Sequence, residues 1–271
     1  MCGFVFYHSV QAPCSEQGFT QALNSLKHRG PDGEGHWLAQ QPYVAIGHTR
    51  LAINGGDSGV QPLHSQGGRV VMVVNGELYN SRTPLEQAGV TFQTGSDSEY
   101  LLHQYIRQGV ECLDELDGEF AFAIWDRETQ SAYLGRDRHG IKPLFYTLYN
   151  GALLAASEIK ALLAYGVPAK WNHTYLAGAA FFAQDARGTP VEGVFSLPPG
   201  HYLKVSGEGV ECLPYVRRSP FEPSQFSSTG LSFEQACAQF EHYLLSAIEK
   251  RLPHNESVQT YLSSGIDSSV I

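Results

Sequence analysis

The second residue of the chain is a cysteine, and its position gives it a chemistry that an internal cysteine lacks. Met1 precedes a small residue, which is the usual setting for removal of the initiator methionine. Cys2 would then hold the free α-amine, whose ordinary pKa of about 7.7–8.0 leaves much of it neutral near pH 8. Such an amine can accept the proton of the thiol, so one residue supplies both nucleophile and base. On position alone, the alternative is an incidental cysteine at a frayed terminus.

Three other polar segments are of interest, and each taken alone has a structural interpretation. Asn75-Gly76 is a dipeptide that is common in turns at the end of a strand. Arg50 alone is interpreted as a partner in a surface ion pair. Asp97 alone is interpreted as the cap of the helix expected after it.

Short β-rich runs must position these residues, because such runs dominate the first two hundred positions. The expected strands are residues 3–7, 43–48, 69–75, 120–126, 132–135, 144–148, 152–156 and 201–205. Helical periodicity appears at 19–26 and 101–106. The strands at 71–74 and 120–125 are apolar almost throughout, which predicts burial on both faces. We therefore expect an α+β fold of two packed, largely antiparallel sheets flanked by helices.

The composition changes near residue 207, which predicts a domain at 2–207, a linker at 208–230 and a second unit at 231–271. Ser232 with Gln235 forms a capping-box pattern, and apolar residues at helical spacing follow as far as Ile248. A strand is expected at 258–262, followed by a Ser- and Gly-rich loop at 263–269. Helix, strand and loop in this order are typical of the beginning of a parallel α/β domain, which we expect to be incomplete here.

Composition excludes several classes of protein. The formal net charge of −9 disfavours a nucleic-acid-binding protein, which needs a basic face. No apolar run approaches the roughly 20 residues that span a bilayer, and the N-terminus lacks a signal-peptide pattern, so we expect a cytoplasmic protein with no membrane partner.

The cysteines and histidines do not predict a metal site. Five cysteines without zinc-ligand spacing predict free thiols in a reduced compartment. His28, His48 and His139 are interpreted as structural, because a nucleophile with its own amine needs no imidazole.

Ten ordered motifs resemble those of the class II glutamine amidotransferases, and more narrowly those of glutamine-hydrolysing asparagine synthetases. They are CGF (2–4), HRGPD (28–32), HTRLAI (48–53), QPL (61–63), NGELYN (75–80), GSDSE (95–99), LDGEFAFA (116–123), RDRHGIKPL (136–144), SEIKAL (157–162) and LPPGH (197–201). The resemblance covers nearly the whole chain. It implies a four-layer αββα N-terminal-nucleophile sandwich, followed by the first elements of an α/β ATP-pyrophosphatase domain.

The resemblance also implies roles for individual residues. Cys2 would attack the side-chain amide of glutamine, and Asn75 and Gly76 would form the oxyanion hole. Arg50 would bind the α-carboxylate of glutamine and Asp97 its α-ammonium group. Ile53, through its backbone, and Glu77 belong to the same pocket in the family. This step needs no cofactor. The chain alone is expected to hydrolyse glutamine but not to make asparagine.

The loop at 263–269 resembles the pyrophosphate loop S-G-G-x-D-S-S of ATP pyrophosphatases. The implied ATP-binding residues are Leu262, Ser263, Gly265, Asp267, Ser268 and Ser269, while Ser264 stands where the pattern usually has glycine. In the complete enzyme, Mg-ATP would activate aspartate and the released ammonia would convert it to asparagine. Two alternatives stay open, a tailoring amidotransferase with another carboxylate acceptor and a non-catalytic glutamine-binding module. A homodimer is plausible by analogy with the family.

Overall fold

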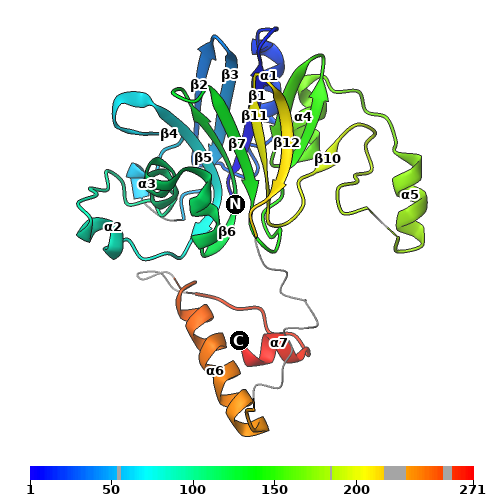
Figure 1. The fold of residues 1–271 in the computed structure, drawn as a ribbon. Coiled ribbons are helices and arrows are strands. Elements are labelled where there is room, and N and C mark those ends of the chain that lie inside the picture. Colours follow the sequence, from blue (N-terminus) through cyan, green and yellow to red (C-terminus); the bar gives the residue numbers. More distant parts are fainter. Residues whose placement is uncertain (54–55, 184, 217–229, 253–257) are drawn as a thin grey trace. The chain divides into compact units, whose positions relative to one another are not determined.

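The computed structural model describes residues 1–53, 56–183, 185–216, 230–252 and 258–271. The chain divides into two compact units, Met1–Arg217 and Arg218–Ile271. The first unit consists mainly of two six-stranded sheets in which every paired strand is antiparallel (Figure 1). None of the helices in these ranges has the length and apolar character needed to cross a membrane.

Sheet I contains the beginning of the chain. Its strands are β1 (Gly3–Ser9), β2 (Gly33–Gln40), β3 (Tyr43–Arg50), β8 (Phe145–Tyr149), β9 (Ala152–Ala156) and β10 (Phe195–Ser196), in the order β10-β8-β9-β1-β3-β2. Sheet II contains β4 (Leu63–His64), β5 (Val70–Leu78), β6 (Gly118–Asp126), β7 (Ser131–Arg136), β11 (His201–Ser206) and β12 (Gly209–Pro214), in the order β12-β11-β7-β6-β5-β4. All eight strands expected between residues 3 and 205 are present.

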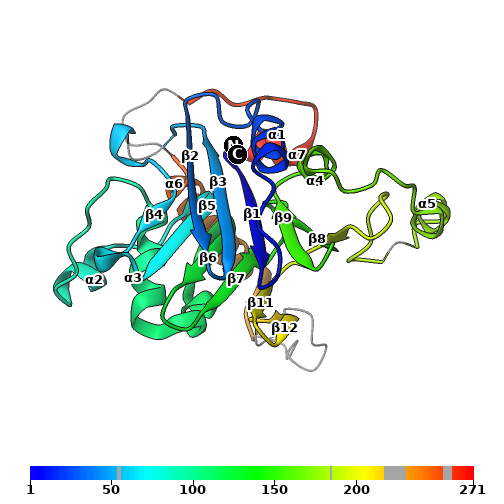
Figure 2. The same ribbon diagram turned by 90° about the horizontal axis from the view of Figure 1, so that it is seen from above.

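The helices of the first unit are α1 (Glu16–Asn24), α2 (Thr83–Gln87), α3 (Ser98–Gln108), α4 (Ile159–Tyr165) and α5 (His173–Ala180), with 3-10 helices at Gly56–Ser58, Gln66–Gly68 and Gly109–Glu115. Residues of α1 and α4 pack on the outer face of sheet I and residues of α2 and α3 on that of sheet II, whereas α5 has no buried residue. Figure 2 shows α1 and α4 beside β1 and β9, and α3 on the side of β4 and β5. The Ser15 hydroxyl accepts the Gly18 amide at the start of α1, so α1 begins with a side-chain cap.

Alternate residues of each strand enter different cores. Phe4 and Phe6 of β1 lie with Val73 of β5 in the core between the sheets. Val5 and Tyr7 instead lie under α1 and α4, and a third core lies under α3. The central strands are buried on both faces, as expected. These four layers, helix, sheet, sheet and helix, are the predicted α+β sandwich.

Two expectations about the organisation of the chain need correction. The first unit was expected to end at residue 207, yet β12 pairs with β11 at 209–214 and extends sheet II, so the compact unit continues to Arg217. The rest of the expected linker, 217–229, lies outside the described residues. The strand predicted at 258–262 is absent from these residues. Its apolar run has no neighbouring strand among the described residues of the second unit, and a strand needs a hydrogen-bonded partner.

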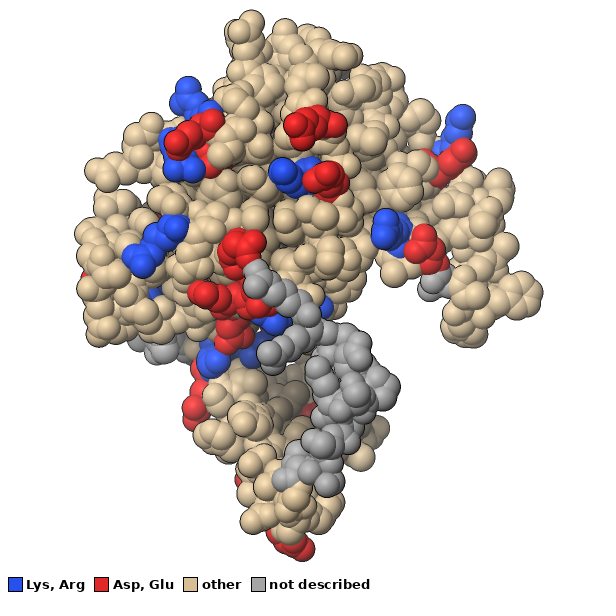
Figure 3. Space-filling view, in the orientation of Figure 1, with Lys and Arg blue, Asp and Glu red and all other residues tan. Residues whose placement is uncertain are grey.

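The charges on the first unit are mixed in sign. On the face shown in Figure 3, Lys and Arg side chains lie close to Asp and Glu side chains in small groups. Ion pairs in the first unit include Arg69 with Asp126 and Arg138 with Asp114.

Candidate functional site

The alternation of side chains along β1 and β3 directs two predicted site residues between the sheets. Phe4 and Phe6 face the inter-sheet core, so Cys2, two residues before Phe4, has the same orientation. Val44 and Ile46 face that core from β3, which gives Arg50 at the end of β3 the inner orientation too. Cys2 and Arg50 therefore lie at the same end of sheet I.

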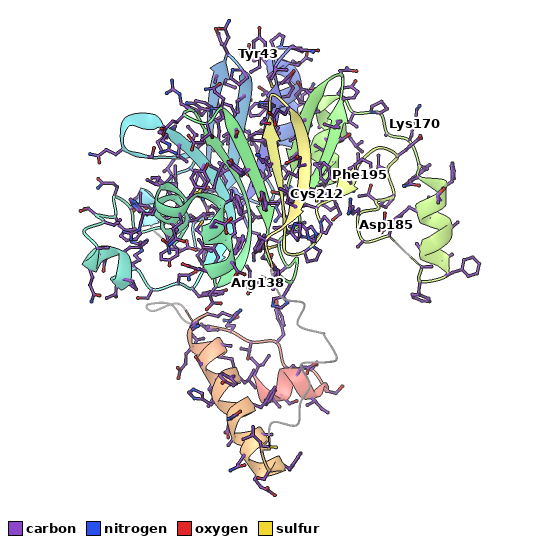
Figure 4. All side chains as sticks on the ribbon, viewed as in Figure 1. Tyr43, Arg138, Lys170, Asp185, Phe195 and Cys212 are labelled. Atoms are coloured by element: carbon purple, nitrogen blue, oxygen red, sulfur yellow. The ribbon has the colours of Figure 1, made fainter. Side chains whose placement is uncertain are left out.

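Strand β5 supplies the facing residues from sheet II. Val71 and Val73 lie in the inter-sheet core, so Asn75 and Glu77 continue the same face. Both β1 and β3 contact β5 across the sandwich. Arg50 lowers and Glu77 raises the pKa of the Cys2 thiol, so both charges act on the sulfur. In Figure 4, Tyr43 and Arg138 mark opposite ends of the first unit, and this site lies at the end of Arg138, where β7 also finishes.

The thiol of Cys2 is held by the backbone of Leu51, the residue that follows β3. The Leu51 amide donates to Sγ at 3.4 Å, and Sγ lies 3.6 Å from the Leu51 carbonyl oxygen. Burial raises the pKa of the thiol, while the Leu51 amide opposes that rise. The thiol is thus protonated at neutral pH and needs a base to become a nucleophile. Sequence reasoning missed Leu51, because its contribution is a backbone group without a side-chain signature.

The backbone of Cys2 is fixed by a buried arginine. Arg29 Nε donates to the Cys2 carbonyl oxygen at 2.8 Å, and its Nη1 pairs with Glu158 Oε1 at 2.8 Å. Only 8% of the Arg29 side chain is exposed. This contact places Arg29 in the framework that holds the Cys2 backbone.

The α-amine of Met1 lies beside the same site. Burial is the main cause that lowers its pKa, the charge of Cys2 opposes that shift, and the charges of Arg29 and Lys142 lower the pKa further. Lys142 Nζ lies 3.9 Å from the Met1 sulfur and 3.4 Å from Glu119 Oε2. These directions describe the chain with Met1 in place, whereas the α-amine of Cys2 exists only after Met1 is removed.

Asn75 is buried without a hydrogen-bond partner. Its side chain is only 1% exposed, and neither Oδ1 nor Nδ2 has a partner in the described part of the chain. A buried amide normally finds partners, because leaving one unpaired costs about 1–3 kcal/mol. Such a group, at the end of a strand that faces a thiol, is available to a bound molecule.

Gly76 is required by the close approach of β6. A Cβ atom there would lie 2.2 Å from the Glu119 carbonyl oxygen and 2.6 Å from the Phe120 Cα. Both neighbours are backbone atoms that cannot move aside easily, so a side chain at residue 76 does not fit.

Asp97 is tied to β5 rather than to its own helix. Its Oδ2 accepts the Leu78 amide at 2.6 Å, and it makes no side-chain cap at the start of α3. Burial raises the pKa of this carboxyl, and the Leu78 amide opposes the rise. The carboxylate of Asp97 therefore makes no cap hydrogen bond to α3. It bonds instead to β5 at Leu78, which lies two residues beyond Gly76 along the strand.

Arg50 and Ile53 border the segment after β3. Arg50 Nη2 donates to the Gly56 carbonyl oxygen, and the Ile53 amide donates to the Leu51 carbonyl oxygen at 3.0 Å. Asp32 accepts the Ala52 amide at 2.8 Å and so holds the same segment. Ile53 is half exposed, whereas Arg50 ends the buried strand.

Among the described residues, the histidines occupy structural or surface positions. His48 is fully buried, and burial lowers its pKa to about 4. His28 is a surface group that pairs with Glu158 Oε1 at 3.0 Å, and His139 is exposed. No cluster of three or more His, Cys, Asp or Glu residues in the described ranges could hold a metal ion.

The second unit contains the predicted ATP-binding residues. Helix α6 (Phe233–Glu249) begins with the expected capping box between Ser232 and Gln235. Helix α7 (Ile266–Val270) begins after Gly265 and includes Asp267, Ser268 and Ser269, while Leu262 is exposed.

The loop that precedes α7 is bonded to itself. The Ser268 hydroxyl accepts the Ser263 amide at 3.0 Å, and the Ser263 hydroxyl accepts the Gly265 amide at 3.2 Å. Hydroxyls and amides suit a phosphate in chemical type. These two amides, however, would have to exchange their present partners for phosphate oxygens.

Comparisons with known proteins agree with this geometry. The family described as glutamine amidotransferase domain matches residues 1–216. Asparagine synthetase [glutamine-hydrolyzing] 3 of Bacillus subtilis is 34% identical over 100% of this chain and 44% of its own length. Amidase chry2 of Gibberella zeae is 37% identical over 92% of this chain and 37% of its own length. The chain thus spans less than half the length of these relatives.

A solved structure shares the fold. Glutamine phosphoribosylpyrophosphate amidotransferase from B. subtilis matches 80% of this chain and 50% of its own with a TM-score of 0.61 and 24% identity. That likeness confirms the predicted sandwich of two sheets between helices.

Proposed function

This chain belongs to the glutamine amidotransferase domain family, of the asparagine synthetase type, and on that premise we propose how its residues release ammonia from glutamine. Once Met1 is removed, the α-amine of Cys2 accepts the thiol proton, directly or through a water. The thiolate attacks the side-chain carbonyl carbon of glutamine. Collapse of the tetrahedral intermediate breaks the C–N bond, and the protonated amine returns its proton to the departing ammonia. Water then hydrolyses the thioester to glutamate and restores the thiol.

The pKa of the thiol supports this division of labour. Burial raises the pKa of Cys2, so the thiol is protonated at neutral pH and needs the α-amine as its base. Transfer of that proton costs free energy, so it is completed only as the thiolate attacks. Arg29 and Leu51 hold the residue in place while this happens.

Asn75 and Gly76 would stabilise the oxyanion of the tetrahedral intermediate. The Asn75 side chain faces the inter-sheet space and is buried without a partner among the described residues, and this is the single observation on which the proposal depends. A donor fixed before the substrate arrives needs no reorganisation during reaction, and one such donor is worth about 2.7–4 kcal/mol of barrier.

Arg50 and Asp97 would bind the two charged ends of glutamine. The guanidinium suits the α-carboxylate, and the buried Asp97 carboxylate suits the α-ammonium group. Burial raises the pKa of Asp97 because it disfavours the charged carboxylate. An ammonium group that binds beside Asp97 would stabilise this charge. Glu77 and the backbone of Ile53 would complete the pocket.

Glutamate release from glutamine tests this mechanism. Cys2→Ala is expected to abolish turnover, because it removes the nucleophile. Cys14→Ala is the matched control, since Cys14 is another half-buried thiol that bonds to Tyr165 far from Asn75 in the fold. The intact mass of each preparation establishes that Met1 has been removed. Turnover that persists in Cys2→Ala, or that is absent from a chain whose Cys2 amine is free, contradicts the proposal.

For the longer protein, we propose that ammonia aminates aspartate activated by Mg-ATP, giving asparagine. The relatives named asparagine synthetase support this acceptor, and Ser263, Gly265, Asp267, Ser268 and Ser269 with Leu262 would form the ATP-binding loop. ATP would supply the activation of the carboxylate as an acyl-adenylate. Asparagine formation with glutamine, ATP and aspartate is the measurement.

A second candidate is a tailoring amidotransferase with another carboxylate acceptor, and the relative named amidase chry2 favours it. Glutaminase activity together with ATP consumption that depends on a carboxylate other than aspartate would identify this candidate. Glutamine binding without any turnover, measured by calorimetry, would indicate a binding module instead.

A further inference from the structure

One edge of β5 is covered by a strand for only part of its length. Strand β4 pairs Leu63 with Met72 and His64 with Val71, and it ends there. Continuing this antiparallel register by two residues places Gln61 opposite Val74. At Val74, however, the hydrogen bonds that a neighbouring strand would make with its backbone are made by the side chain of Gln61.

The Gln61 carboxamide makes both bonds that a strand residue would make. Its Oε1 accepts the Val74 amide at 2.6 Å, and its Nε2 donates to the Val74 carbonyl oxygen at 3.1 Å. The residue is only 5% exposed. Its own backbone packs closely against β2, because a Cβ at Gly35 would lie 2.1 Å from the Gln61 carbonyl oxygen.

A second buried side chain approaches the same carbonyl group. His48 Nε2 lies 3.2 Å from the Val74 oxygen, and since a carbonyl only accepts, this nitrogen must be the protonated one. The peptide group immediately before Asn75 is thus held by two side chains from outside sheet II. Val74 is the last residue before the proposed oxyanion donors.

Strand geometry links this clamp to the oxyanion donors. Backbone amides alternate in direction, so the amides of Val74, Gly76 and Leu78 all point to the same edge of β5. The Val74 amide is taken by Gln61 and the Leu78 amide by Asp97. On the opposite side, the Phe120 carbonyl across from Gly76 accepts the Asp137 amide and therefore turns away from β5. The Gly76 amide lies between two amides that are fixed by side chains.

We propose that Gln61 is a positioning residue for the oxyanion hole. By replacing a strand at Val74, it fixes the direction of the Asn75 side chain and of the Gly76 amide without touching glutamine. The inference rests on the proposed function, because it assigns these two donors to the tetrahedral intermediate. A misplacement of a catalytic group by about 1 Å can cost on the order of a hundredfold in rate.

Gln61→Met tests the proposal, since it keeps the length and volume of the side chain and removes both bonds. The kcat for glutamine hydrolysis is expected to fall about tenfold to a hundredfold, less than for loss of a donor itself, with KM changed by less than about twofold. Alkylation of Cys2 by iodoacetamide, which forms no oxyanion, is expected to keep its rate. In an Asn75→Leu background, Gln61→Met is expected to cause a smaller further loss than in the wild-type chain, because only the Gly76 amide is then left to position.

Ser65→Ala is the matched control. The Ser65 hydroxyl accepts the Val70 amide at 2.9 Å, so it makes the same kind of side-chain bond to the same edge of β5, at the end far from the site. Its removal is expected to weaken the fold without lowering kcat. A similar fall in kcat in both variants would show that Gln61 acts only through stability, and would overturn the proposal.

Amide hydrogen exchange separates this inference from the proposed function. Gln61→Met is expected to speed exchange at Val74, whose amide bonds to Gln61, while Val70 remains protected by Ser65. Unchanged protection at Val74 overturns the role of Gln61 alone, whatever the turnover. Absence of turnover in the wild-type chain with a free Cys2 amine overturns the proposed function, and with it the catalytic consequence of the clamp.

Discussion

Asn75→Leu is expected to change activity and stability in opposite directions. Leucine has nearly the shape of asparagine but neither polar atom, so it leaves the packing of β5 intact. In the wild-type chain, both amide atoms are buried without a partner among the described residues. Relieving that desolvation is expected to raise the free energy of unfolding by about 1–3 kcal/mol. Loss of the oxyanion donor is expected to lower kcat about 100-fold to 1,000-fold.

Two assays on the same preparations measure the effect. Urea unfolding followed by tryptophan fluorescence reports stability, because Trp125 is buried in the inter-sheet core. Glutamate release reports kcat. Asn172→Leu is the control, since the Asn172 side chain accepts the Tyr175 amide at the start of α5. That variant is expected to lose about 0.5–2 kcal/mol of stability and to retain full turnover.

The reasoning is refuted by a variant that is destabilised and still active. That result would mean that the amide of Asn75 is used within the fold, so its burial would be structural. A loss of both stability and activity would instead indicate that leucine distorts β5. Iodoacetamide labelling of Cys2 at the wild-type rate would exclude such a distortion.

Two further predictions concern charge. Asp97→Asn keeps an acceptor for the Leu78 amide but removes the negative charge, so KM for glutamine is expected to rise about tenfold to a hundredfold with kcat little changed, as steady-state kinetics would show. A fall in kcat at constant KM would contradict this role. The pKa of His48, about 4 when folded against an ordinary 6.5, means that the unfolded chain binds a proton first as pH falls. Stability is therefore expected to decline between pH 6.5 and 4 by up to about 3 kcal/mol, and less steeply in His48→Gln; equal slopes in urea titrations would argue against it.

The sequence was sufficient for the strands that have a clear period or an unbroken apolar run. It did not identify β2, whose segment GEGHWLAQ contains two glycines and alternates half-buried with exposed residues. That strand forms because β3 pairs with it along its whole length at the edge of sheet I. The opposite error occurred at 258–262, where local β propensity has no partner strand among the described residues. Pairing, rather than propensity, decided both cases.

The candidate site residues were predicted from the motifs that contain them. Cys2, Asn75 and Asp97 each have a structural interpretation when taken alone, as a frayed terminus, a turn and a helix cap, and only the ordered set of motifs gave them a function. Gln61 was part of a recognised motif, yet nothing in its residue type predicts that it pairs with Val74, thirteen residues away. Its contact depends on where β4 ends, which is a property of the folded sheet.

The side chains along the edge of β5 also bear on self-association. An open strand edge with successive free amides can pair with another chain and begin aggregation. Ser65 bonds to the amide of Val70, β4 pairs with Met72, Gln61 bonds to the amide of Val74 and Asp97 to that of Leu78. Among the described residues of this edge, the amide of Gly76 is the one left for a foreign strand. A strand edge with one unpaired amide can bind a single oxygen atom, but it cannot pair with a further strand, because strand pairing needs several successive amides. The same arrangement that would expose a donor to a substrate therefore protects the molecule against edge-to-edge pairing.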